Sequence, residues 1–268
     1  MNPNRLSYKD ETAIRRKKKP KTVREGTHLF PATSYERRPL PSRGDGYARW
    51  KRTADVVVAA GLFVFTLPVM LVALLLVRLT TKGPGVYVQV RLGEAGVPFR
   101  IFKIRTMVDN CEADTGPLWA APRDPRVTRV GVVLRATHID ELPQLWNVLV
   151  GDMSLVGPRP ERPEIAEKLV RDIPRYYERL AMKPGISGLA QVQLPPDTTV
   201  RSAADKLLLD LAYLDHAGTW LDIKILACTV LKLLTVSSGR FRPLLRSALP
   251  PAIDSSKLMA PARARRAA

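Results

Sequence analysis

The longest apolar run of the chain covers residues 56–77 and contains no charged side chain. As an α-helix, about 22 such residues are long enough to cross a bilayer. Pro68 lies near the middle, where it removes a helical hydrogen bond and favours a sharp bend. Lysines and arginines flank both ends, and the positive-inside tendency would keep both flanks in the cytoplasm. We therefore favour a re-entrant hairpin over a single span, and both over a buried soluble helix.

Beyond this run the apolar positions follow strand spacing first and helical spacing later. Alternation over 86–90 and an apolar stretch over 99–104, separated by a turn at 93–98, predict a β-hairpin. Segment 142–149 places three leucines and a tryptophan on one helical stripe. Segment 220–236 is an amphipathic pattern whose apolar face suits a membrane surface or, nearly as well, the protein core.

These elements predict a helix-dominated α+β fold. We expect one membrane-associated, monotopic domain with a re-entrant helix hairpin broken at Pro68, interfacial amphipathic helices and a small β-hairpin. The composition divides the chain into a basic, disordered extension at 1–47, a membrane helix at 48–82, a folded domain at 83–236 and a basic, flexible tail at 237–268.

The net charge of +18 comes mainly from the two ends. Residues 1–53 hold 15 Lys and Arg against five Asp and Glu, and residues 236–268 hold seven against one. Such ends beside a membrane segment favour anionic lipid head groups, although they could also be solvated charge runs or bind nucleic acid. Because the chain lacks an aromatic-rich basic surface or a recognisable nucleic-acid-binding fold, we expect no specific nucleic-acid partner.

The two cysteines, Cys111 and Cys228, are too few for a disulfide framework or a metal cluster. They fit a reducing compartment. The first 50 residues lack the apolar core of a signal peptide.

Asp140 and Glu141 stand side by side where the helical segment 142–149 begins. Since Pro143 is tolerated only in the first turn, the helix should start near Asp140, at the positive end of its dipole. That position stabilises a carboxylate and an incoming phosphate. Adjacent carboxylates also suit Mg²⁺, with Asp140 as a ligand. The same pair would serve equally well as ordinary helix-capping residues, so it does not establish a site alone.

Segment 157–160 strengthens the hypothesis of a phosphate site, because Gly-Pro-Arg-Pro forms a rigid loop that presents Arg159. A guanidinium held between two prolines loses little freedom when it binds phosphate. Lys103 and Arg105 project from the predicted hairpin and become phosphate contacts if the hairpin lies beside the acidic pair. Together with the apolar run, these residues indicate phosphate chemistry at a bilayer surface.

The motifs that follow one another along residues 51–235 resemble the bacterial sugar transferase family, the monotopic phosphoglycosyl transferases. Besides the proline-broken apolar run, the motifs are KR-x-x-D at 51–55, Q-x-R at 89–91, KIRTM at 103–107, LR at 134–135, DELPQLWNVL at 140–149, GDMSLVGPRP at 151–160 and PGISGLAQV at 184–192. The resemblance covers about two-thirds of the chain and identifies 83–236 as a catalytic domain.

The resemblance implies an enzyme at the cytoplasmic face of the bacterial inner membrane. It would transfer a sugar 1-phosphate from a nucleoside diphosphate sugar, usually UDP-linked, to undecaprenyl phosphate. The products would be undecaprenyl-diphospho-sugar and UMP, in the first membrane step of exopolysaccharide assembly, with downstream glycosyltransferases as further partners. Asp140 would be the nucleophile of a covalent phosphosugar intermediate, Glu141 would position or deprotonate the acceptor phosphate, and Mg²⁺ would neutralise the diphosphate.

The same resemblance assigns binding roles. Arg159 would hold phosphate, with Arg135, Arg105 and Lys103 as further anion contacts. Asp210 matches an acidic position of the family, with a role in substrate binding, in catalysis or in the structure.

The chain departs from the family pattern at two places. Leu67 precedes Pro68 where the family often has serine. QLPPDTTVR at 193–201 replaces a Gly-Arg segment that is associated with the nucleotide, and Arg201 could stand in for that arginine. The sequence therefore leaves the sugar open among glucose, galactose and N-acetylated sugars, and leaves the oligomeric state open.

A non-catalytic, membrane-tethered adaptor with polybasic ends is the alternative. It predicts that Asp140 and Glu141 can be replaced without loss of function.

Overall fold

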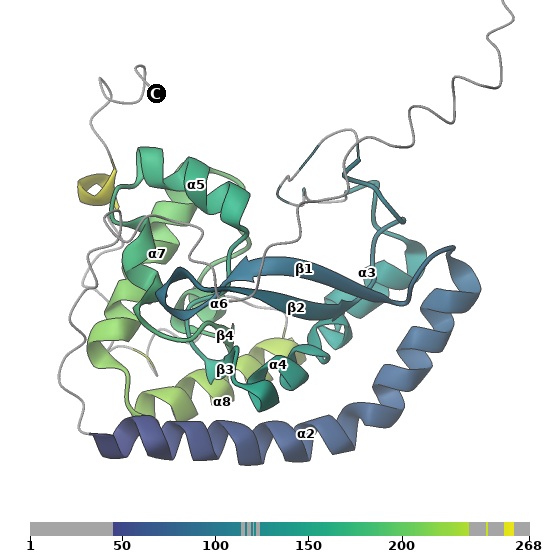
Figure 1. The fold of residues 1–268 in the computed structure, drawn as a ribbon, viewed down its shortest axis with the longest axis horizontal. Coiled ribbons are helices and arrows are strands. Elements are labelled where there is room, and N and C mark those ends of the chain that lie inside the picture. The colour runs from purple at the N-terminus through teal and green to yellow at the C-terminus, as the bar shows by residue number, and fades with distance from the viewer. Residues whose placement is uncertain are drawn as a thin grey trace, which may run out of the picture.

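The computed structural model describes residues 45–113, 116, 119, 121, 124–235, 245 and 255–259. Most of the predicted extension at 1–47 and of the predicted tail at 237–268 lies outside these residues. Helices dominate the fold, as the sequence predicted (Figure 1). The α-helices are α2 (Asp45–Thr80), α3 (Arg129–Ala136), α4 (Gln144–Val150), α5 (Pro163–Asp172), α6 (Leu189–Gln193), α7 (Val200–His216) and α8 (Thr219–Thr235). The 3₁₀ turns are η2 (Glu94–Gly96), η3 (Ile139–Glu141), η4 (Tyr176–Ala181) and η6 (Ser256–Leu258).

Helix α2 runs along one edge of the molecule and contains the apolar run. Its helical structure continues through Pro68, and Figure 1 shows it curving in its second half rather than separating into two helices. Pro68 lacks the N–H that a straight helix would use there. Thr66 Oγ1, 2.7 Å from the carbonyl oxygen of Leu62, adds a bond that often bends helices. The structure thus has a curved helix in place of the expected break, and the re-entrant topology stays a prediction.

The first turns of α2 are fixed to the domain by the charged residues of the KR-x-x-D motif. Asp55 is buried and accepts hydrogen bonds from Ser154 Oγ at 2.7 Å and from the backbone N–H of Leu155 at 3.2 Å. Arg52 donates to two carbonyl oxygens near the end of α4, those of Val148 at 2.6 Å and its neighbour at 2.9 Å. Because helix C-termini leave carbonyls without partners, Arg52 both caps α4 and ties it to α2.

A second tie joins α2 to α8 and α7 through one carboxylate. Asp222 on α8 accepts from Lys51 at 2.8 Å and from the Tyr47 hydroxyl at 3.0 Å, both on α2. The buried Tyr213 hydroxyl on α7 donates to the same carboxylate at 2.7 Å. Three helices therefore converge on Asp222.

The far end of α2 is held by Arg105. Its side chain is only 5% exposed and its Nη2 donates to the carbonyl and hydroxyl oxygens of Thr81, at 3.2 and 2.7 Å. Arg105 directly follows the strand that ends at Ile104, so it links the end of α2 to that strand.

The predicted β-hairpin is confirmed. Strands β1 (Val86–Leu92) and β2 (Pro98–Ile104) pair antiparallel, from Val86 opposite Ile104 to Leu92 opposite Pro98. The η2 turn joins them, and it needs Gly96 because the backbone there is left-handed, with φ at 74°.

A second, parallel pair was not predicted. Strands β3 (Ser154–Val156) and β4 (Gly185–Ser187) are only three residues long and pair in register. Gly157 and Gly185 let the two backbones approach, since a Cβ on Gly157 would lie 2.4 Å from the carbonyl oxygen of Lys183. Three residues are too short for a periodic pattern, which explains why the sequence did not reveal the strands.

Helix α7 lies between the two main cores. On one side Leu209 and Tyr213 join a cluster with Ala59 of α2 and residues of α4, β3, α6 and α8. On the other side Leu207 and Leu211 join α5 and η4. Of the predicted tail, the described Leu245 and Leu258 are buried against these clusters, so at these points the tail packs on the domain.

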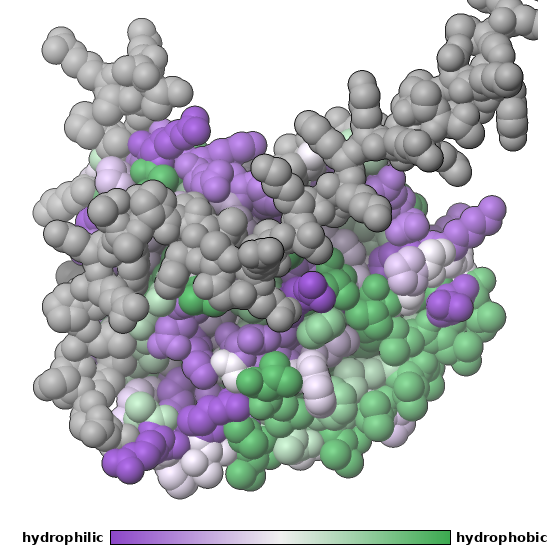
Figure 2. Space-filling view, in the orientation of Figure 1, coloured by the Kyte–Doolittle hydropathy of each residue, from purple (hydrophilic) through white to green (hydrophobic). Residues whose placement is uncertain are grey.

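One face of the molecule is apolar and exposed. Figure 2 shows it as a continuous green surface along the curved half of α2. Its side chains on α2 are Val57, Val58, Leu62, Val64, Phe65, Leu67, Val69, Leu71, Val72, Leu75, Leu76 and Leu79. Within the described part of the chain, α2 is the helix that is long and apolar enough to cross a membrane. An exposed apolar surface of this extent marks a membrane or protein contact.

Helix α8 combines the two alternatives that its sequence left open. Leu221, Ile225 and Cys228 are buried in the core, whereas Ile223 and Val230, from the predicted apolar face, are about half exposed. The helix therefore packs on the domain with one side and presents apolar side chains with another.

We expect Asp55→Ala to destabilise the protein, because the buried Leu155 N–H loses its acceptor and the Ser154 hydroxyl keeps only the carbonyl oxygen of Val156. Such a loss costs about 1–3 kcal/mol, visible as a lower melting temperature in detergent. Thr53→Ala is the matched control, since Thr53 is exposed and its hydroxyl bonds only within α2. Equal melting temperatures for the Asp55 variant and wild type would show that this tie does not hold α2.

Candidate active site

The acidic pair lies on the short η3 turn between α3 and α4. His138, which precedes it, adopts a left-handed backbone with φ at 55°, and Pro143 stands immediately before α4. The predicted helix start is therefore a 3₁₀ turn followed by the α-helix. Its predicted apolar stripe divides, because Leu145 is buried while Trp146 is half exposed, with its ring 6.2 Å from that of Phe63 on α2.

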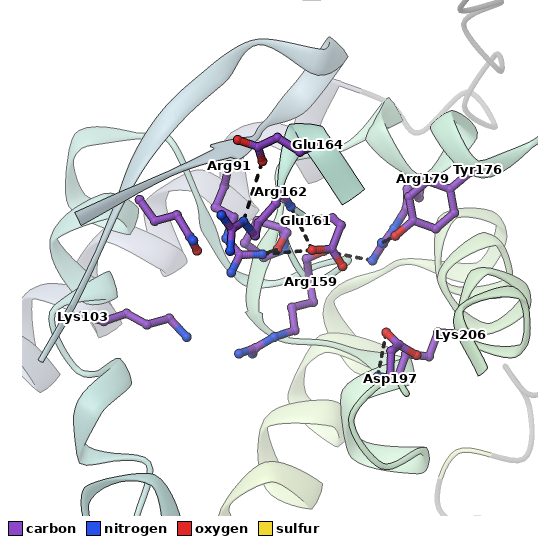
Figure 3. Close-up of polar contacts among 12 residues, drawn as sticks. Arg91, Lys103, Arg159, Glu161, Arg162, Glu164, Tyr176, Arg179, Asp197 and Lys206 are labelled. Carbon is purple, nitrogen blue, oxygen red and sulfur yellow. Dashed lines mark hydrogen bonds and ion pairs between the residues drawn. The ribbon is translucent and has the colours of Figure 1, made fainter. Parts of the chain in front are cut away.

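Two cations bind Glu141. Lys103 Nζ from β2 lies 2.7 Å from Glu141 Oε1, and Arg159 from the loop after β3 reaches the same oxygen at 2.5 Å and Oε2 at 3.4 Å. Figure 3 shows the Lys103 and Arg159 side chains pointing from opposite sides into one space. Burial alone would raise the pKa of Glu141, but Arg159 and Lys103 outweigh it and hold that pKa well below its ordinary value. Glu141 is thus a firmly ionised carboxylate.

Asp140 differs from its neighbour. It is 7% exposed and accepts no hydrogen bond from the described residues. Burial and the adjacent Glu141 raise its pKa, against the opposing charges of Lys103 and Arg135. An ionised carboxylate in this position is poorly stabilised by the protein itself, so it is available to a phosphorus atom or a cation.

The structure brings five of the predicted site residues together: Asp140, Glu141, Lys103, Arg159 and Arg135. Arg135 lies in the last turn of α3, where its Nε donates to Thr106 Oγ1 at 2.8 Å, and its charge still acts on Asp140.

Three other predicted residues lie apart from this group. Arg105 is buried against Thr81 and holds α2. Asp210 is 1% exposed on α7 and pairs with Arg179 at 2.7 Å. Burial raises the pKa of Asp210 to about 6, although Arg179 opposes this. Arg201 is exposed in the first turn of α7 and contacts neither residue of the acidic dyad, Asp140 and Glu141. A direct substrate contact by these three stays a prediction.

The sequence did not reveal a group of arginines around the loop of Arg159, labelled in Figure 3. Arg91 lies 3.1 Å from Glu161, and Arg162 donates two 2.8 Å bonds to Glu112. Arg91 belongs to the Q-x-R motif, which could have drawn attention to it. Arg179 lies in a stretch with no such signal.

The donor set fits a single Mg²⁺ only in part. Among the residues that the structure describes, no three His, Cys, Asp or Glu side chains gather as they would around a protein-enclosed metal. Mg²⁺ is, however, commonly held by one or two carboxylates together with substrate phosphates. Asp140, which has no partner in the part of the chain that the structure describes, could supply that carboxylate, and Mg²⁺ stays a prediction.

Among the described residues Asp140 has no partner and Glu141 binds two cations, on a turn that contacts the apolar surface helix α2. This makes the pair a candidate site for chemistry on anionic substrates. Comparison with known proteins identifies the family. The pattern described as "Bacterial sugar transferase" matches residues 46–236. The chain belongs to this family.

Three relatives indicate the range of named activities within the family. A Caulobacter vibrioides protein named UDP-glucose:undecaprenyl-phosphate glucose-1-phosphate transferase is 45% identical over 192 residues, or 70% of this chain and 71% of the relative. An Aeromonas hydrophila UDP-N-acetylgalactosamine-undecaprenyl-phosphate N-acetylgalactosaminephosphotransferase is 41% identical over 72% of this chain, which is 46% of its own length. The exopolysaccharide production protein PSS of Rhizobium leguminosarum bv. phaseoli is 36% identical over 70% of this chain and 97% of its own length.

The lowered pKa of Glu141 makes part of the stability depend on pH. Because its folded pKa lies below its ordinary value of 4.5, the ionised side chain contributes stability above about pH 4.5, and this contribution is lost as the pH falls through the folded pKa. We expect Glu141→Gln to lose about 1–3 kcal/mol at pH 7 and progressively less at acid pH. Melting curves between pH 3 and pH 7 would show this convergence, with the exposed Glu94→Gln as control. A constant difference across the range would contradict it.

Proposed function

We propose that this protein transfers a sugar 1-phosphate from a UDP-sugar to undecaprenyl phosphate, releasing UMP and starting the assembly of a bacterial polysaccharide. The observation that carries the proposal is the unequal pair on η3: among the described residues Asp140 has no partner, while Glu141 holds two cations. Family membership and the names of the relatives supply the substrate class.

Asp140 is the nucleophile of this proposal. One of its carboxylate oxygens forms a bond to the β-phosphorus of the donor, and the bond from that phosphorus to the bridging oxygen breaks. UMP leaves with the electron pair. An oxygen of undecaprenyl phosphate then attacks the same phosphorus and expels the carboxylate, which regenerates Asp140.

Glu141 acts as a positioning residue rather than a base. Its pKa is held well below the ordinary value, so it has little tendency to accept a proton at neutral pH. The acceptor phosphate is already an anion there and needs no strong base. Lys103 and Arg159, which Glu141 holds beside Asp140, offset the repulsion between two anionic substrates and a carboxylate.

Asp140 would hold Mg²⁺, which would supply further charge neutralisation for the leaving UMP.

The apolar face supports an enzyme lying on the cytoplasmic side of the inner membrane. On both sides of η3, short helices expose apolar side chains: Val132 and Val133 on α3, and Trp146 and Val150 on α4. The dyad thus lies between elements that can contact lipid. The acceptor keeps its phosphate at the bilayer surface, at the depth where such helices would lie. Lysines and arginines on both flanks of α2 favour the cytoplasmic side for the domain.

The first experiment measures UMP release by the detergent-solubilised protein with undecaprenyl phosphate, Mg²⁺ and a panel of UDP-sugars. We expect release with one sugar and a loss of at least about 10³-fold in Asp140→Asn, since the nucleophile is removed. Glu94→Gln, an exposed carboxylate of η2, should keep full activity. The panel includes glucose and N-acetylgalactosamine donors, because the names of the relatives give different sugars.

The covalent step has its own readout. Without undecaprenyl phosphate, wild-type protein should release at most one UMP per molecule and retain labelled sugar phosphate, and Asp140→Asn should do neither. Equal release by that variant would remove Asp140 as nucleophile. Absence of release with every donor would argue for the non-catalytic adaptor.

The re-entrant topology predicts that Pro68 keeps both ends of the chain on one side of the membrane. Tags at the N-terminus and C-terminus should both resist protease in intact spheroplasts. In Pro68→Leu the helix can straighten, so in part of the molecules the C-terminal tag should become digestible while the N-terminal tag stays protected. Val69→Leu, at the exposed neighbouring position, is the control. Tags on opposite sides in wild type would show that α2 spans the bilayer.

A further inference from the structure

Every backbone carbonyl of the loop at 158–161, which presents Arg159, accepts a hydrogen bond. Two of the donors are backbone N–H groups and two are arginine side chains. In order along the loop, they are Gly185 N at 2.9 Å, Arg179 Nη2 at 2.9 Å, Arg91 Nη1 at 3.2 Å and Leu92 N at 2.9 Å. Pro158 and Pro160 are buried, where a carbonyl needs such a partner, and the four bonds together hold the backbone of this loop in place.

Arg179 bonds the carbonyl of Arg159 itself. It comes from η4 and is only 7% exposed. The nitrogen that donates to Arg159 also lies 2.7 Å from Asp210 Oδ2, and its other terminal nitrogen donates to the Tyr176 hydroxyl at 2.6 Å. The Tyr176 ring lies beneath the guanidinium, 5.1 Å from it. Four contacts to three residues thus fix one side chain.

The buried pair of Arg179 and Asp210 calls for a reason other than stability. Taking two charges out of water costs several kcal/mol, and apolar residues of similar volume often replace such pairs without loss of stability. What an apolar pair could not do is donate a hydrogen bond to the carbonyl of Arg159. The pair also leaves little net charge, so Arg179 does not compete with Arg159 for phosphate.

We infer that Arg179, oriented by Asp210, is a positioning residue that fixes the backbone of Arg159 so that the Arg159 guanidinium meets Glu141 and the substrate phosphate. The Arg159 side chain is 45% exposed and long, so its backbone anchor decides where it can reach. This inference rests on the proposed function and assigns Asp210 an indirect role in place of a substrate contact.

The test is a double-mutant cycle on the kcat/KM of UMP release. We expect Arg179→Gln to lower kcat/KM by about 10²-fold, because small misplacements of a binding group can cost that much. In an Arg159→Ala background the same change should cost less than about twofold, since the group it positions is gone. A purely structural role would cost the same factor in both backgrounds, and that result would overturn the inference.

Matched variants separate positioning from folding. Arg175→Gln, which removes the exposed arginine just before η4 and its pair with Glu178, should leave kcat/KM unchanged. If Arg179→Gln unfolds, Arg179→Met combined with Asp210→Leu removes both charges together and should restore the melting temperature but not the activity. Recovery of activity in that double variant would contradict the inference.

The same cycle on binding of inorganic pyrophosphate by calorimetry does not require turnover. If only the proposed function is wrong, no UMP is released, but Arg179→Gln still weakens pyrophosphate binding and this effect still vanishes in the Arg159→Ala background. If the Arg179 effect persisted there, or if no binding depended on Arg159, the inference itself would be wrong.

Discussion

Glu141 accepts hydrogen bonds from Lys103 on β2 and from Arg159 on the loop after β3, and this shared carboxylate joins the β-hairpin to the loop at the site. Its occupation by two cations distinguishes it from Asp140, the adjacent carboxylate with no partner among the described residues. Two neighbouring acids therefore acquire different properties from their surroundings alone. The cations that neutralise Glu141 also lie where a phosphate approaching Asp140 would need them, so charge compensation is in place before any substrate binds.

The depth of this site relative to the bilayer depends on how α2 is attached. Asp55 and Arg52 fix its early turns to β3 and α4, and Arg105 fixes its end at Thr81. Between these ties the helix curves past Pro68 and exposes its apolar side (Figures 1 and 2). Because η3 contacts α2 as well as lying next to α4, the helix that meets the lipid is mechanically joined to the dyad. A change in the seating of α2 would therefore move Asp140.

The sequence predicted those parts whose signal is local. The hairpin of β1 and β2 and the proximity of Asp140 to Glu141 follow from alternation and adjacency. The meeting of Lys103, Glu141 and Arg159 was inferred only as a consequence of the family resemblance, since the three residues are far apart along the chain. Strands β3 and β4 were missed because three residues carry no period, and they pair through close backbone contact at two glycines. The burial of Arg105 and Asp210, 5% and 1% exposed, could not be read from residue type, and their predicted contact with substrate stays a prediction.

Several charged side chains of this fold follow a common physical rule. A buried charge needs a partner, and in this fold the partner is repeatedly a backbone group of a segment that must be held: Asp55 binds the N–H of Leu155, Arg52 the end of α4, and Arg105 the carbonyl of Thr81. Each contact offsets desolvation by a charge-assisted hydrogen bond and at the same time fixes a backbone position. Apolar packing fixes position less sharply, because hydrophobic burial is non-directional. Transfer between two anionic substrates tolerates little displacement of the charged groups, so the directional bonds stand where the dyad, the loop of Arg159 and the membrane helix meet.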